Sequence, residues 1–158
     1  DSVSTYLSRG PASEGEGRLD TPRPDTPQSD TPQPDTPPDT SLLADRAGGT
    51  LWRLAADTGR RYAAGSGDWN PIHLHALTAR PLGFPTAIAH GMYTYARAMA
   101  DTAPRVGTRE VTSTVWFAKP VRLPSTVRSR SLVDAGRTLT LLSDRAGSID
   151  HAVIENRW

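Results

Sequence analysis

Nine consecutive residues near the middle of the chain combine the side chains needed to handle a water molecule. They read Gly-Ser-Gly-Asp-Trp-Asn-Pro-Ile-His and place a carboxylate, Asp68, five positions before an imidazole, His73. Asn is a preferred N-cap and Pro a preferred first helical residue. The pair Asn70-Pro71 therefore predicts that a helix begins at Pro71, with His73 in its first turn. Asp68 would lie in the loop before it, and the two side chains could converge on one small polar spot.

The amino-acid composition limits the classes of protein to which this chain could belong. A chain of 158 residues without cysteine is typical of one domain that has neither disulfides nor a thiolate metal site. No apolar run approaches the roughly 18 residues that would indicate a membrane span, and no charged-then-apolar leader marks secretion. We expect a cytoplasmic protein.

Charge divides the chain into two parts. Residues 1–50 carry four Arg against nine acidic residues, a net of −5, and the remainder of the chain carries +6. A moderately basic domain suits an anionic ligand such as a nucleotide-bearing thioester. The arginines are scattered rather than gathered in a stripe with aromatic residues, which argues against a nucleic-acid partner.

The first fifty residues differ in kind from the rest. Asp-Thr-Pro recurs about every five residues from Asp20 onward. Proline has no backbone N–H to donate, and the segment has little apolar surface that folding could bury. We expect residues 11–50 to form a Pro/Thr/Asp-rich disordered linker. Residues 1–10 alternate as on a strand edge but have nothing nearby to pair with, so they are interpreted as either a strand remnant of a preceding domain or an irregular tail.

Residues 51–158 should form the folded α+β domain. A strand is expected at 51–54, and a longer helix should run from Gly91 to Thr102, where Pro104 follows. Four strands should come next, at 111–117, 126–133, 137–143 and 148–156, with Ala-Gly pairs at 135–136 and 146–147 making hairpins. Short helices are expected at 58–64 and 71–80. The economical packing is one long central helix wrapped by a curved antiparallel sheet.

Three blocks, in order, resemble the MaoC-like (R)-specific enoyl-CoA hydratases, also called hydratase 2. The first block is Tyr-Ala-Ala-Gly-Ser-Gly-Asp-Trp-Asn-Pro-Ile-His at 62–73, followed by Ala79. Gly-Phe-Pro at 83–85 with Ile-Ala-His-Gly-Met at 88–92 resembles the second. Phe-Ala-Lys-Pro-Val at 117–121 with Leu-Pro at 123–124 resembles the strand beyond the central helix. The resemblance covers residues 51–158 and implies a hotdog fold.

The resemblance also implies a reaction and its catalytic residues. Water would add reversibly to a trans-2-enoyl thioester, carried by coenzyme A or acyl carrier protein, and no cofactor would be needed. Asp68 and His73 would be the catalytic pair, with Asn70 beside them and the backbone N–H of Gly91 facing the thioester oxygen. Substrate contacts would come from Ser66, Gly67, Phe84, Ile88, His90 and Met92.

Elementary chemistry agrees with these roles. A neutral imidazole is a suitable general base near pH 7, and the positive end of a helix would disfavour its protonated form. A fully solvated Asp is too acidic to return a proton well, so we predict a partly dry site around Asp68. A helix N-terminus offers unpaired N–H groups, and glycine at position 91 would let a ligand approach them closely.

Several of these residues have a purely structural interpretation. Asn70 could be only a helix cap, Ser66 only a turn residue, and His90 a structural hydrogen-bonding residue. No metal site is expected, because His73 and His75 stand two apart on a helix and face different sides. Packing roles are expected for three aromatic residues, Tyr62, Trp69 and Trp116. Candidates for binding the carrier's phosphates are Arg80, Arg97, Arg109, Lys119 and Arg122.

Two other functions fit a hotdog domain. A thioesterase would hydrolyse the thioester itself, but the motif offers no nucleophile beyond the water-handling pair. A non-catalytic subunit would only complete a partner's acyl-binding tunnel, a role that would not require both Asp68 and His73. In each case we expect a homodimer or pairing with a second hotdog domain.

Overall fold

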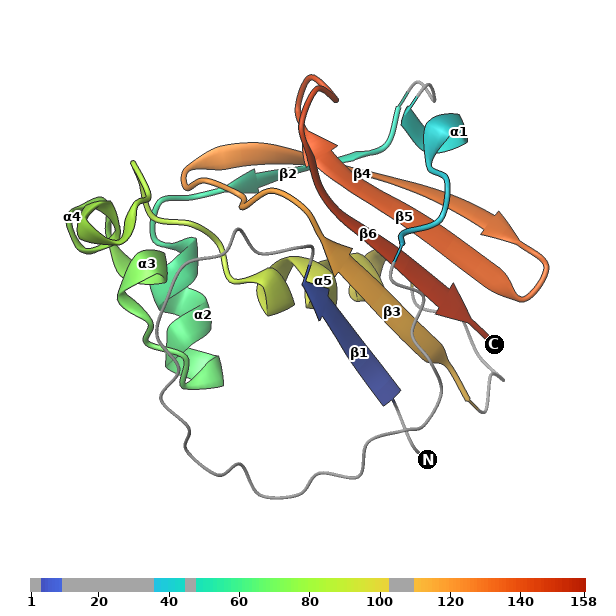
Figure 1. Ribbon diagram of the computed structural model, residues 1–158, viewed down its shortest axis with the longest axis horizontal. Coiled ribbons are helices and arrows are strands. Elements are labelled where there is room, and N and C mark those ends of the chain that lie inside the picture. Colours follow the sequence, from blue (N-terminus) through green and yellow to red (C-terminus); the bar gives the residue numbers. More distant parts are fainter. Residues whose placement is uncertain (1–3, 10–35, 45–47, 103–109) are drawn as a thin grey trace.

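The computed structural model describes residues 4–9, 36–44, 48–102 and 110–158 (Figure 1). The expectation of a disordered linker over residues 11–35 and the phosphate candidate Arg109 lie outside these ranges. The strands are β1 (Ser4–Arg9), β2 (Thr50–Leu54), β3 (Thr112–Phe117), β4 (Ser125–Asp134), β5 (Arg137–Asp144) and β6 (Asp150–Arg157). The α-helices are α1 (Ser41–Ala44), α2 (Thr58–Ser66), α3 (Pro71–Leu74), α4 (Ala76–Ala79) and α5 (Gly91–Thr102). A 3₁₀ turn follows α4 at Arg80–Leu82.

The strands form one sheet in the order β1-β3-β6-β5-β4-β2, antiparallel throughout except between β1 and β3. Both predicted hairpins are confirmed. They turn at Gly136 (φ 72°) and Gly147 (φ 84°), in the left-handed region that glycine adopts without steric cost. These turns keep β4, β5 and β6 adjacent and leave β2 and β3 to flank them.

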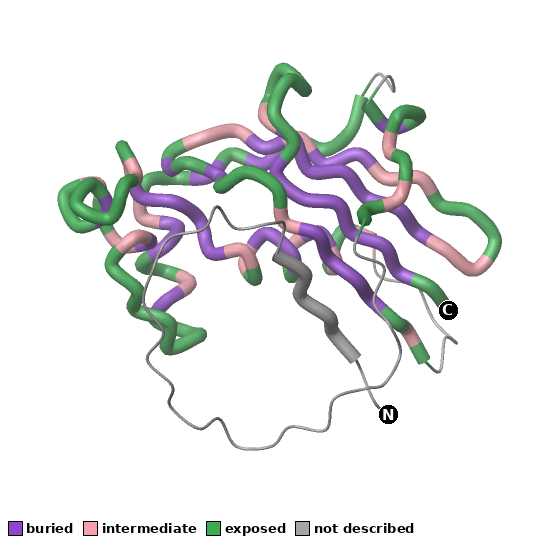
Figure 2. Tube along the Cα trace, in the orientation of Figure 1, coloured by how far each residue is buried: buried purple, intermediate pink, exposed green. Residues whose placement is uncertain are grey.

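The long helix α5 lies along one face of the sheet, as Figure 1 shows. Its bounds match the prediction, and Tyr95 and Ala98 pack into a core with Val115, Leu142 and Ile154 of the sheet. Figure 2 shows the buried backbone concentrated in the central strands. A helix wrapped by a curved sheet was the predicted arrangement, and it fixes the N-terminal end of α5 beside α2 and α3.

The opposite face of the sheet is also covered. Leu43 of α1 is 1% exposed and packs in a second cluster with Trp116, Leu139, Leu141 and Val153. The end of the expected linker therefore differs from the prediction, because Leu43 gives this segment apolar surface to bury, while Leu42 stays exposed. The interiors of β3, β5 and β6 are buried on both faces, whereas buried and exposed residues alternate along β2.

The expectation that residues 4–9 have nothing to pair with is wrong. The backbone of β1 pairs in parallel with β3, from Ser4 opposite Thr112 to Arg9 opposite Phe117. Parallel pairing needs a long crossover between the strands, and here about a hundred residues separate them. No short-range sequence signal can indicate such a pairing.

The single helix expected over residues 71–80 is broken in two. His75 has extended backbone angles (φ −156°, ψ 153°), and its Nδ1 accepts the N–H of Leu77 at 3.2 Å, so the imidazole caps α4. Thr78 reinforces the corner by donating to the carbonyl of Pro71 at 2.7 Å. Among the helices described, none combines the length and apolar character that crossing a bilayer requires.

Candidate active site

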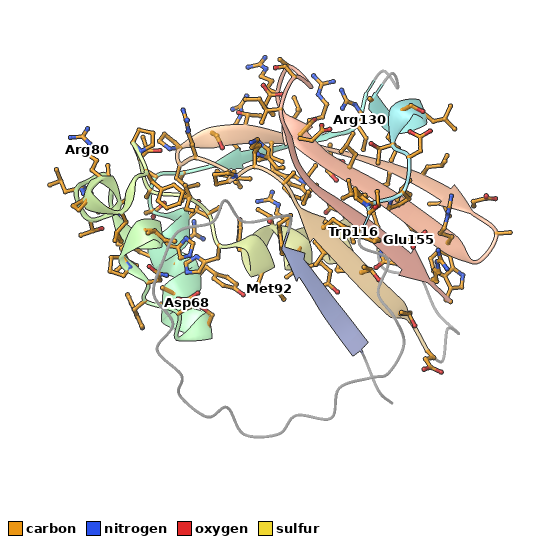
Figure 3. All side chains as sticks on the ribbon, viewed as in Figure 1. Asp68, Arg80, Met92, Trp116, Arg130 and Glu155 are labelled. Carbon is orange, nitrogen blue, oxygen red and sulfur yellow. The ribbon has the colours of Figure 1, made fainter. Side chains whose placement is uncertain are left out.

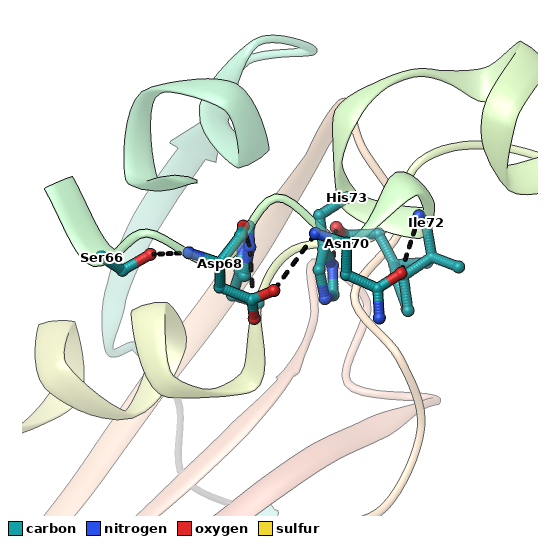
Figure 4. Close-up of polar contacts among 7 residues, drawn as sticks. Ser66, Asp68, Asn70, Ile72 and His73 are labelled. Carbon is teal, nitrogen blue, oxygen red and sulfur yellow. Dashed lines mark hydrogen bonds and ion pairs between the residues drawn. The ribbon is translucent and has the colours of Figure 1, made fainter. Parts of the chain in front are cut away.

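Three hydrogen bonds, each joining residues two apart in the sequence, shape the loop between α2 and α3 (Figure 4). Ser66 Oγ accepts the N–H of Asp68 at 3.3 Å, Asp68 Oδ1 accepts the N–H of Asn70 at 3.2 Å, and Asn70 Oδ1 accepts the N–H of Ile72 at 3.3 Å. Gly67 turns the chain out of α2 with φ 76°. Asn70 is thus the predicted N-cap of α3, and Ser66 serves the turn.

His73 lies in the first turn of α3, as predicted, and is 8% exposed. Its Nδ1 lies 2.9 Å from the carbonyl oxygen of Ile88. A carbonyl can only accept, so Nδ1 carries the proton and Nε2 keeps its lone pair for a base.

Burial lowers the pKa of His73 below 6.5, and the neighbouring His90 lowers it further, against opposing effects of the Ile88 carbonyl and Asp68. The predicted direction is therefore confirmed, but its chief cause is desolvation rather than the dipole of a helix. A helix of four residues, Pro71–Leu74, has only a small dipole to offer.

His90 is the residue that joins Asp68 to His73. It is 3% exposed, its ring stacks on that of His73 with centroids 3.7 Å apart, and Tyr62 packs on it at 4.8 Å. Its Nε2 donates to the backbone carbonyl of Asp68 at 2.9 Å and lies 3.7 Å from Asp68 Oδ2. The Nδ1 atom of this ring is buried without a partner. His90 therefore contacts both Asp68 and His73.

The carboxylate of Asp68 and one ring nitrogen each of His73 and His90 lie within 4.8 Å of one another. The predicted convergence of Asp68 and His73 is therefore present in the structure. The predicted partly dry environment holds for His73 but not for Asp68, whose side chain is 55% exposed. In Figure 3 Asp68 lies at the end of the molecule formed by α2 and α3.

The same three residues form a possible donor set for a divalent cation. His90, and not His75, is the histidine that accompanies His73, because His75 is exposed and caps α4. The rings of His73 and His90 are nearly parallel, at 27°. Parallel rings direct their nitrogen lone pairs side by side rather than at one central ion. The geometry suits acid–base chemistry better than metal binding.

A cavity of about 300 Å³ opens beside His73. Three predicted residues, Phe84, Ile88 and Gly91, line it together with His73. Sequence reasoning gave no role in the cavity to the remaining lining residues, which are Ala89, Thr94, Phe117, Ala118, Lys119, Pro120, Val121 and His151. Most of this lining is apolar, as an acyl group requires.

Gly91 begins α5 at the edge of this cavity. The first amides of a helix have no carbonyl acceptor within it, so the N–H of Gly91 can face a ligand oxygen. A Cβ on this residue would lie 3.0 Å from Cε1 and Cζ of Phe117. A side chain at this position would press on the Phe117 ring, which would have to shift by a few tenths of an ångström.

Other predicted contacts lie away from the cavity. Ser66, Gly67 and Asn70 are exposed in the α2–α3 loop, and Met92 is 41% exposed on the outer side of α5 (Figure 3). The packing role expected for Trp69 is wrong in this chain, since its side chain is 56% exposed. Ser66 and Asn70 hydrogen-bond to Asp68, and none of these residues is among those that line the cavity beside His73.

A short segment, Ala87–His90, ties the site together. Ile88 N–H donates to the carbonyl of Ile72 at 3.0 Å, and the Ile88 carbonyl accepts His73 Nδ1. The segment also hydrogen-bonds to the chain between β3 and β4. Ala89 N–H donates to the Val121 carbonyl, and the Ala87 carbonyl accepts the N–H of Leu123, both at 2.8 Å. The same segment leads directly into Gly91.

Gly59 is a positioning residue that sequence reasoning missed. It is buried in α2, and a Cβ built on it would overlap the backbone carbonyl oxygen of His73. Only glycine lets α2 approach α3 this closely. A glycine inside a predicted helix gives no pattern that would mark it, because the neighbour it meets is fourteen residues away.

The phosphate candidates fall in different places. Lys119 and Arg122 line a second cavity of about 370 Å³ that shares Lys119, Pro120 and His151 with the cavity at His73. Arg97 lines a separate pocket beside α2. Arg80 is exposed, and its Nε lies 3.5 Å from the carbonyl of Pro85.

Solved structures of other proteins share this fold. A crystal structure of HtdX from Mycobacterium tuberculosis superposes with a TM-score of 0.64 at 38% identity, covering 68% of this chain and 46% of that one. The unliganded (R)-hydratase PhaJ1 from Pseudomonas aeruginosa superposes with a TM-score of 0.53 at 26% identity, covering 73% of this chain and 83% of that one. These similarities confirm the hotdog fold.

A curated relative is named 3-hydroxyacyl-thioester dehydratase X, from Mycobacterium tuberculosis (strain ATCC 25618 / H37Rv). It is 52% identical over 67 residues, which are 42% of this chain and 24% of that protein. The chain thus spans about a quarter of the curated relative and about half of HtdX. The family model described as "MaoC like domain" matches residues 30–149. The chain belongs to the MaoC-like dehydratase family.

Proposed function

We propose that this domain is an (R)-specific enoyl thioester hydratase, equally a 3-hydroxyacyl thioester dehydratase in the reverse direction. The observation that carries the proposal is the state of His73. Its Nδ1–H is held by the Ile88 carbonyl, its Nε2 is left as the base, and it lines an apolar cavity that also contains Gly91. Relatives named as a dehydratase and an (R)-hydratase support the same reaction.

The proposed step adds one water across the double bond of a trans-2-enoyl thioester. His73 Nε2 takes a proton from water while the oxygen bonds to C3. The N–H of Gly91 stabilises the negative charge that develops on the thioester oxygen, an interaction typically worth about 3–4 kcal/mol. The carboxyl group of Asp68 gives its proton to C2. The proton held by His73 then replaces it on Asp68. The catalyst is regenerated without an added reagent.

The proposed reaction is acid–base chemistry on a thioester, so the carrier thioester is the substrate and no cofactor takes part. The expected carrier is coenzyme A or acyl carrier protein. We place the activity in the cytoplasm as part of this proposal, in keeping with a chain free of cysteine.

A second hotdog domain is part of the proposal. Asp68 is 55% exposed, its neighbour in sequence Trp69 is 56% exposed, and Met92 at the start of α5 is 41% exposed. A partner covering these residues would exclude water from the side chain of Asp68. The partner would be a second copy of this chain or another hotdog domain.

The test is hydration of crotonyl-CoA and longer enoyl-CoA substrates, followed by loss of enoyl absorbance. We expect Asp68→Asn and His73→Gln each to lower kcat by about 10²–10⁴-fold. Chiral analysis of the product should give the (3R) alcohol. Activity that both substitutions leave unchanged would refute the assignment.

The same samples separate the rival functions. Release of free thiol without loss of enoyl absorbance would indicate a thioesterase. A chain that is inactive alone and active after mixing with a second hotdog domain would support the pairing. In that mixture His73→Gln must still abolish activity, since otherwise the chain is only a scaffold.

A further inference from the structure

A pocket lined by three arginines lies on the other side of α5 from the thioester cavity. It encloses about 420 Å³ and is lined by Arg53, Ala55, Thr58, Arg61, Tyr62, Tyr93 and Arg97. Its volume is in the range of small-molecule sites. No acidic residue is among those lining it, which is unusual in a domain that also contains eight acidic residues after residue 50.

The arginines have no acidic partner in the described part of the chain. Salt bridges there involve His90 with Asp68 and Glu155 with Arg137 and Arg157, and none involves Arg53, Arg61 or Arg97. Arg97 is nevertheless held in place. It donates to the hydroxyl of Tyr93 at 3.1 Å and lies 5.0 Å above the ring of Trp52. A fixed cation without a counter-charge is suited to a ligand anion.

The start of α2 adds backbone donors to the same pocket. Thr58 is the first residue of this nine-residue helix, and its N-cap, Asp57, makes no side-chain capping hydrogen bond. The N–H of Thr58 donates to the carbonyl of Ala55 at 3.1 Å, and the two amides that follow it in the first turn receive no side-chain cap. Helix amides and arginine side chains together are the donors that bind phosphate in many proteins.

We propose that this pocket binds the phosphate groups of an anionic ligand. The proposal adds a second, anion-binding pocket to the proposed function, and the kinetic part of its test rests on that function. Tyr62 is the link between the two sites: it lines the pocket and packs against the ring of His90 at 4.8 Å. A phosphate ester bound here therefore lies one side chain from the residues that support Asp68 and His73. Two sources carry this chemistry, the nucleotide end of a coenzyme A thioester and a free phosphate compound.

The test measures binding of adenosine 3′,5′-bisphosphate by titration calorimetry, without any catalytic step. Each of Arg61→Gln and Arg53→Gln should weaken binding about tenfold, the effect of losing one charged hydrogen bond. These two arginines are exposed, so the variants should fold. Arg145→Gln is the matched control, with the same loss of charge in an exposed hairpin turn outside the pocket, and it should bind as the wild type does.

A kinetic arm distinguishes the two sources. If the ligand is the carrier, Arg61→Gln raises KM for crotonyl-CoA but not for the pantetheine thioester that lacks the nucleotide. If it is a free phosphate compound, bisphosphate binding falls while both KM values stay unchanged. The proposal is overturned if the wild type does not bind the bisphosphate, or if Arg53→Gln and Arg61→Gln both bind it as tightly as Arg145→Gln. An absence of hydratase activity would refute the proposed function and leave the binding result standing.

Discussion

A methyl group added at Gly59 should displace His73, the proposed base. The new Cβ would overlap the His73 carbonyl oxygen and lie 2.9 Å from the carbonyl carbon. Carbon atoms in contact lie about 3.5–4.0 Å apart, so that carbon must retreat by about 0.6–1.1 Å. A catalytic group misplaced by about 1 Å can cost about 10²-fold in rate. We therefore expect Gly59→Ala to lower kcat/KM for crotonyl-CoA by about that factor.

The matched control is in the same helix. Gly65 also lies in α2, but a Cβ there would meet nothing within 4 Å. Gly65→Ala should keep wild-type kinetics and gain about 0.5–1 kcal/mol of stability, because alanine loses less backbone entropy than glycine in a helix. An NMR titration of the His73 ring gives a readout besides activity. A folded Gly59→Ala protein with the kinetics and the His73 titration of the wild type would refute the reasoning.

Five further outcomes are expected. Because burial lowers the pKa of His73, the acid limb of kcat/KM should have its midpoint below pH 6.5, and a midpoint at or above this value would contradict the assignment of the base. The linked stability is present above pH 6.5 and is lost as the pH falls through the lowered pKa, which urea midpoints measured across this range will show. His90→Phe keeps a ring between His73 and Tyr62 but cannot donate to the Asp68 carbonyl, so kcat should fall about tenfold with KM nearly unchanged. Leu43→Ala should cost about 2–5 kcal/mol in urea unfolding without changing KM, because this side chain is 1% exposed against the sheet. Dialysis against EDTA should leave the hydration rate unchanged, since His73 Nε2 must be free to act as the base.

Local sequence signals predicted helix starts and hairpin turns correctly where a single residue type determines the backbone conformation. Asn70 and Pro71 mark the start of α3, and Gly136 and Gly147 mark the hairpins at which φ is positive. The limits of α5 follow from its apolar and small residues. The convergence of Asp68 with His73 followed from the same local geometry.

Long-range contacts were beyond such reasoning. The helix break at His75 depends on an imidazole capping its own downstream turn, a role in which Asn, Asp or Ser is usual. The role of His90 depends on three aromatic rings from separate segments coming together. Phe117 and Lys119 reach the cavity only because β3 ends beside α5. Each of these requires the tertiary fold to be known.

The hydrogen bonds of Ile88 have a mechanical consequence. Its N–H and C=O both bind the turn that bears His73, and three residues later the chain presents the N–H of Gly91. The imidazole of His73, which is the proposed proton acceptor, and the Gly91 amide that would face the thioester are therefore both positioned by the same backbone segment. Thermal motion of the surrounding loops will carry both groups together, so their spacing should persist even while the mouth of the cavity opens to admit a long acyl chain.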